Sequence, residues 1–62
     1  MRIVVYEKTE SGLIIEAKSD LVFVPTHFKN IIELRKYFSR KNYELRKVKL
    51  FDTTYYIIAY DG

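Results

Sequence analysis

The sequence predicts a small α+β fold in which two β-hairpins flank one α-helix, in the order ββ(β)αββ. Three observations lead to this prediction. Both ends of the chain are rich in β-branched and aromatic residues, and turn-forming residues occur at only a few positions. One central segment has apolar residues at helical spacing. Strands grouped around one helix are typical of a mainly antiparallel sheet with the helix on one face. We expect residues 1–62 to form a single domain.

The first hairpin is predicted from residues 2–8 and 13–18, which have strand-like composition. Between them, residues 9–12 end in Gly12, which supplies the positive φ that a hairpin turn needs. A short apolar run follows at residues 21–24, and Pro25 ends it. Because proline donates no backbone hydrogen bond, this run is either a short third strand or a buried connector.

The helix is predicted from His27 to about Lys41, with Thr26 as its N-cap and Asn42 at its end. Its apolar face consists of Phe28, Ile31, Ile32, Leu34 and Phe38. Residues 45–50 and 54–60 then form the second hairpin, joined by a tight connection at residues 51–53.

Alternation along the strands gives the sheet two apolar faces. We expect one face to lie under the helix, formed by Ile3, Val5, Leu13, Ile15, Ile57 and Ala59. The opposite face then carries Val4, Tyr6, Ile14, Tyr56, Ile58 and Tyr60. One helix cannot cover both faces, so this second face is predicted to be a protein interface, for a homodimer or for another protein. The alternative is internal cover, by twisting of the sheet or by residues 21–24.

The composition places the chain among globular proteins, with 48% hydrophobic and 31% charged residues. It has no cysteine, which excludes disulfides and thiolate metal sites, and no apolar run of membrane-spanning length. The start of the chain becomes charged too soon for a signal peptide, so we expect a cytoplasmic protein. Small size without catalytic motifs suits an accessory protein of a phage or mobile element.

No catalytic constellation is recognisable, and we expect neither enzymatic activity nor a cofactor. His27 is the sole histidine, and no serine or threonine stands in a nucleophile motif. Neither Glu7 with Glu10 nor Glu16 with Asp20 has the spacing of a known metal site. A glycine loop that could hold a phosphate is also missing from the sequence.

Positive charge is concentrated in residues 35–49, which hold seven basic residues and one acid, whereas the rest of the chain holds four basic residues and seven acids. Nucleic-acid binding is therefore the alternative function. Its candidate residues are Lys29, Lys36, Arg40, Lys41, Arg46, Lys47 and Lys49, interleaved with Tyr37 and Tyr43. Cations neutralise phosphates, and aromatic rings stack on bases. The competing interpretation is a solvated helix face on which Glu33 pairs with Lys29 or Lys36.

Overall fold

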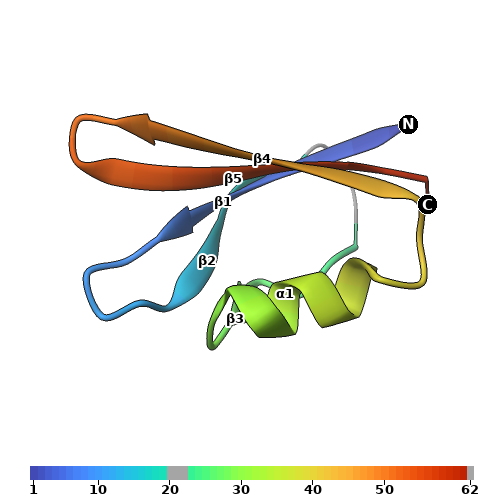
Figure 1. Cartoon of the computed structure of the whole chain (residues 1–62), viewed down its shortest axis with the longest axis horizontal. Helices are drawn as coiled ribbons and strands as arrows, with labels where there is room; N and C mark the ends of the chain where they lie inside the picture. The colour runs from blue at the N-terminus through green and yellow to red at the C-terminus, as the bar shows by residue number, and fades with distance from the viewer. Residues whose placement is uncertain (20–22, 62) are drawn as a thin grey trace.

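The computed structural model describes residues 1–19 and 23–61, and it has one helix and a five-stranded antiparallel sheet (Figure 1). The elements are β1 (Arg2–Lys8), β2 (Ile14–Ser19), β3 (His27–Phe28), α1 (Ile31–Phe38), β4 (Tyr43–Leu50) and β5 (Thr53–Tyr60). The predicted fold class, with the helix on one side of the sheet, is confirmed.

The strand order is β3-β2-β1-β5-β4, so the first strand lies at the centre between the two hairpins. β3 is the edge strand on one side and β4 the edge strand on the other. The helix connects these two edges across one face of the sheet, with its C-terminal end toward the start of β4 (Figure 1). Both hairpin turns extend beyond the helix, at the end of the sheet away from the chain termini (Figure 1).

Among the described residues, those with positive φ lie in the two hairpin turns. Gly12 has φ 91° in the turn between β1 and β2, as the sequence predicts. The turn between β4 and β5 consists of Phe51 and Asp52, with φ 48° and 67°. A two-residue hairpin needs positive φ at these central positions because its twist must match that of the strands. Phe51 adopts this conformation although glycine or asparagine would do so more easily.

The helix is shorter than predicted, and its N-cap is Asn30 rather than Thr26. The Asn30 side chain accepts a hydrogen bond from the Glu33 backbone N–H at 3.0 Å. In return, the Glu33 carboxylate accepts one from the Lys29 N–H at 2.9 Å. This reciprocal cap satisfies the backbone amides of Glu33 and Lys29. Residues 27–28 pair instead with β2, and Ser39 caps the other end in place of Asn42.

The helix covers the opposite sheet face from the one predicted. The six residues predicted to form an exposed interface lie in the core beneath α1: Val4, Tyr6, Ile14, Tyr56, Ile58 and Tyr60. They pack with Phe28, Leu34 and Phe38. The prediction that these six residues form a protein interface is therefore wrong. We call this covered side the inner face and the other side the outer face.

Side-chain size explains the inversion. The inner rows hold Tyr6, Tyr56 and Tyr60, and the Phe38 ring on the helix packs against Tyr60 with centroids 5.0 Å apart. The Tyr6 ring contacts Phe28 edge-on at 5.3 Å, while its hydroxyl donates a hydrogen bond to the Pro25 carbonyl at 2.9 Å. A tyrosine can thus be buried when its hydroxyl finds a backbone partner. The prediction that the face with the small residue Ala59 lies beneath the helix did not take this partner into account.

The segment 21–24 lies partly outside the described residues, so its predicted role applies here only to Phe23 and Val24. Val24 packs against the core, whereas Phe23 is fully exposed. In the described part of the chain, no helix has the length and apolar character needed to cross a membrane.

Candidate interaction surfaces

The outer face is apolar along its middle and no described element covers it (Figure 1). Strand register places Ile3 beside Ala59, and Val5 beside Ile57. The next row continues with Tyr55 beside Val48 on the edge strand. Most of these side chains are half-buried by one another. Ile3 remains 50% exposed at one corner and Leu50 54% exposed at the other.

The charged side chains of the outer face balance one another. Glu7 and Lys18 lie on one side of the apolar rows, and Glu44 and Arg46 lie on the edge strand. Arg46 forms an ion pair with Glu44 at 3.1 Å. Arg46 is therefore separated from the other predicted nucleic-acid-binding cations. The outer face as a whole combines apolar rows with two acids and two bases.

The helix side of the molecule carries most of the positive charge. Its basic residues project from the inner strand rows, from α1 and from the segments flanking α1: Arg2, Lys8, Lys29, Arg35, Lys36, Arg40, Lys41, Lys47 and Lys49. Among described residues, the acids on this side are Glu16 and Glu33, and the Glu33 carboxylate is engaged in the helix cap.

The predicted cations on this side fall into separate groups. Lys36 and Arg40 line one shallow hollow together with Tyr37 and Lys41. Lys41 also lies over the Tyr60 ring, with its Nζ 5.6 Å from the centroid. Lys29 lies at the other end of the helix, and Tyr43 is half-buried against the core. The sequence segment therefore spreads over several surfaces and does not form one patch.

Three basic residues on this side were not selected in the sequence analysis: Arg2, Lys8 and Arg35. Lys8 shares the inner face because it alternates with Tyr6 and Val4 along β1. Arg35 follows the buried Leu34 by one residue, on the helix flank opposite Tyr37. Since Tyr37 packs toward Phe28 on β3, the flank with Arg35 faces β5 and β4. Alternation along β1 places Lys8 on the same face as Val4 and Tyr6. That face was predicted from the sequence to lie away from the helix, so Lys8 was not grouped with the basic residues of the helix.

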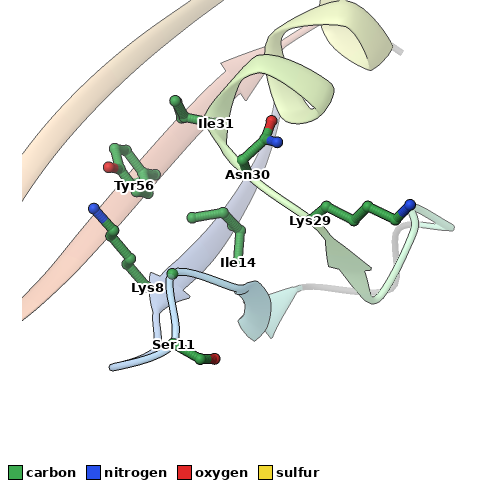
Figure 2. Close-up of a pocket in the computed structure, with 8 residues that line it drawn as sticks. Lys8, Ser11, Ile14, Lys29, Asn30, Ile31 and Tyr56 are labelled. Carbon is green, nitrogen blue, oxygen red and sulfur yellow. The ribbon is translucent and has the colours of Figure 1, made fainter.

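A hollow of about 320 Å³ lies between the first hairpin, the start of α1 and Tyr56 (Figure 2). Lys8 extends into it beside Tyr56, while Lys29 extends away from its centre (Figure 2). Two backbone amides near the helix start, those of Lys29 and Glu33, are already engaged by the Glu33 and Asn30 side chains. The remaining polar lining is Ser11, and the lining residues include no acid or histidine that could pair with Lys8 for acid–base chemistry.

Chemically reactive groups are not gathered in the described part of the chain. His27 is exposed and lies 3.3 Å from the Thr26 hydroxyl. No three metal-ligating side chains of the described residues come together. Burial raises the pKa of the Tyr6 phenol above its usual range, and the charge of Glu16 is a smaller cause. This tyrosine is a core residue hydrogen-bonded to a carbonyl, so its perturbed pKa reflects packing.

No protein-family model matches this chain, and no curated protein or solved structure is significantly similar to it.

Proposed function

We propose that this protein is a non-catalytic binding protein that self-associates through its outer sheet face. The observation that supports this most directly is the apolar set of rows that no described element covers. The function expected from the sequence, a protein interface on the second sheet face, is kept, but its residues change. They become Ile3, Val5, Ile15, Val48, Tyr55 and Ile57 in place of the six core residues.

Charge favours a second copy of the chain as the occupant of this face. The chain has a net charge of +3, so two copies repel each other when their basic sides approach. The outer face carries equal numbers of acids and bases, and a face-to-face arrangement directs both helix sides outward. Glu44 and Arg46, which form an ion pair within one copy, present both signs of charge on this face rather than a net positive charge.

The available area indicates a weak dimer. Four long strands about 4.8 Å apart and about 24 Å long present roughly 450 Å² of sheet plane per copy. Two facing copies thus bury on the order of 900 Å² in total, not counting the extra surface of protruding side chains. This area is at the low end of the range for specific interfaces. We expect a dissociation constant on the order of micromolar, since small interfaces retain little free energy after the costs of association.

The experiment is sedimentation velocity over a concentration series, with Ile57→Lys as the test variant. The lysine adds charge at the centre of the apolar rows and leaves the core untouched, so the dimer should be lost while the circular dichroism stays unchanged. Ile32→Lys is the matched control, since Ile32 lies on the helix and is 63% exposed. A monomeric wild type at millimolar concentration, or equal loss in both variants, contradicts the proposal.

A second candidate function is binding of nucleic acid by the helix side. The observation that favours it is the segregation of nine basic side chains from the balanced outer face. A polyanion would gain counterion-release free energy at this surface, so its affinity should fall steeply with salt. Fluorescence anisotropy with labelled oligonucleotides at several salt concentrations tests it. Absence of binding at low salt in the 100 µM range rejects it, because non-specific binders are engaged there.

A further inference from the structure

The inner face of the sheet has a strip that the helix leaves open, along β4 and the hairpin ends. Lys8, Thr54 and Lys49 lie side by side on three neighbouring strands. Lys47 lies in the next row, beside Tyr56. Two strand spacings separate the outer members of the first row, so Lys8 and Lys49 stand about 10 Å apart with a hydroxyl between them.

The cations of this strip are available to a ligand. Lys8, Lys47 and Lys49 are all exposed, and no carboxylate in the described part of the chain lies within ion-pair distance of them. Arg35 is also exposed and lies on the helix flank opposite Tyr37. The hollow at the turn end of the strip is also lined by three acids: Glu7, which belongs to the outer face, and Glu10 and Asp52, which lie in the turns. Positive charge therefore lines the strip between the helix and the turn.

Phe51 lies at the hairpin tip, at one end of this strip. Its backbone has a left-handed conformation, which is unfavourable for a bulky residue. Phe51 lines the same hollow as Lys8, Lys49 and Thr54. The side chain is 99% exposed, and its backbone has φ 48°. An exposed aromatic residue at a position that favours glycine costs stability without adding to the core. Such local strain points to a function for the side chain.

We propose that this strip binds the sugar–phosphate backbone of single-stranded nucleic acid, with Phe51 stacking on a base. Aligned lysines and a hydroxyl suit phosphate groups, and a freely accessible ring suits unpaired bases of any sequence. Duplex bases are already stacked on one another and offer no face to Phe51. This inference rests on the nucleic-acid function proposed above and assigns its surface and its class of ligand.

The test is anisotropy of labelled single-stranded and double-stranded oligonucleotides with the triple variant Lys8→Gln, Lys47→Gln and Lys49→Gln. Each lost phosphate contact should reduce the log–log salt slope by about 0.7, or about 2 for all three. The control removes an outer-face cation that pairs with no described acid, by Lys18→Gln, and should leave the slope nearly unchanged. Circular dichroism verifies the fold of each variant.

Phe51→Ala tests the stacking part, with Phe23→Ala as its control because Phe23 is also fully exposed. Loss of one stacking contact should weaken single-strand binding about 5- to 150-fold, and Phe23→Ala should have little effect. Equal weakening by both phenylalanine variants, or no weakening by Phe51→Ala, overturns the stacking assignment.

The remaining outcomes separate the surface from the function. If Lys36→Glu with Arg40→Glu abolishes binding and the triple lysine variant does not, nucleic-acid binding stands but the strip is the wrong surface. If the wild type binds duplex as tightly as single strands, the ligand class is wrong. If it binds neither, both the inference and the nucleic-acid function fail.

Discussion

Ile57 and Ile58 provide a direct comparison of the two faces of the sheet. They are identical, adjacent and in the same strand, but Ile58 is fully buried beneath the helix whereas Ile57 lies on the outer face. Substituting each with alanine changes β-propensity equally. Any difference in the free energy of unfolding between the two variants therefore reports burial alone.

The expected difference is large compared with the stability of so small a protein. Ile58→Ala should cost about 2–5 kcal/mol, because it removes buried methyl groups and leaves a cavity. Ile57→Ala should cost no more than about 1 kcal/mol, the span of the β-propensity scale. A chain of 62 residues has a total stability of about 3–9 kcal/mol, so Ile58→Ala removes much of it.

Urea denaturation followed by circular dichroism measures both variants, at low micromolar concentration to keep self-association small. Ile58→Val, expected to cost about 0.5–1.5 kcal/mol, gives a folded reference if Ile58→Ala does not fold. Equal costs at positions 57 and 58, or a larger cost at 57 in dilute protein, would refute the assignment of inner and outer faces.

Three further predictions concern local features. The raised pKa of Tyr6 means that folding favours the neutral phenol, so its contribution to stability is complete below about pH 10 and is lost above it; urea titrations should show a shallower alkaline loss in Tyr6→Phe, and an equal loss would contradict this. Asn30→Ala should lower the free energy of unfolding by about 0.5–2 kcal/mol, since it removes the N-cap; an unchanged midpoint would show that the cap contributes nothing. Phe51→Asn with Asp52→Gly should raise the free energy of unfolding in urea by about 1 kcal/mol, because both positions have positive φ, which asparagine and glycine adopt more easily. A decrease would mean that the turn is not strained.

The arrangement of elements could be predicted from the sequence because each had a local signal. Gly12 marked the first turn, and the apolar spacing from Ile31 to Phe38 marked the helix. The helix start was misplaced because Thr26 and Asn30 are both suitable caps. Only Asn30 has a glutamate three residues later, which forms the reciprocal cap. Residues 27–28 could therefore extend and pair with β2.

The sheet face that the helix covers was harder to predict, because β1 and β5 carry apolar side chains on both of their faces. It depends on long-range packing of the Phe38 ring and on the partner found by the Tyr6 hydroxyl. A second non-local feature is the bulge in β2, where Val5 pairs with Lys18 but Tyr6 pairs with Glu16. The bulge interrupts strict alternation, so counting along β2 does not assign Ala17 to a face.

Isotope-filtered NOE spectroscopy on an equal mixture of labelled and unlabelled protein tests the proposed self-association most directly. At concentrations above the micromolar dissociation constant, we predict contacts between copies that involve the methyl groups of Val5, Val48 and Ile57. Contacts only from the exposed edge of β4, or an absence of contacts between copies at millimolar concentration, would contradict assembly through the outer face.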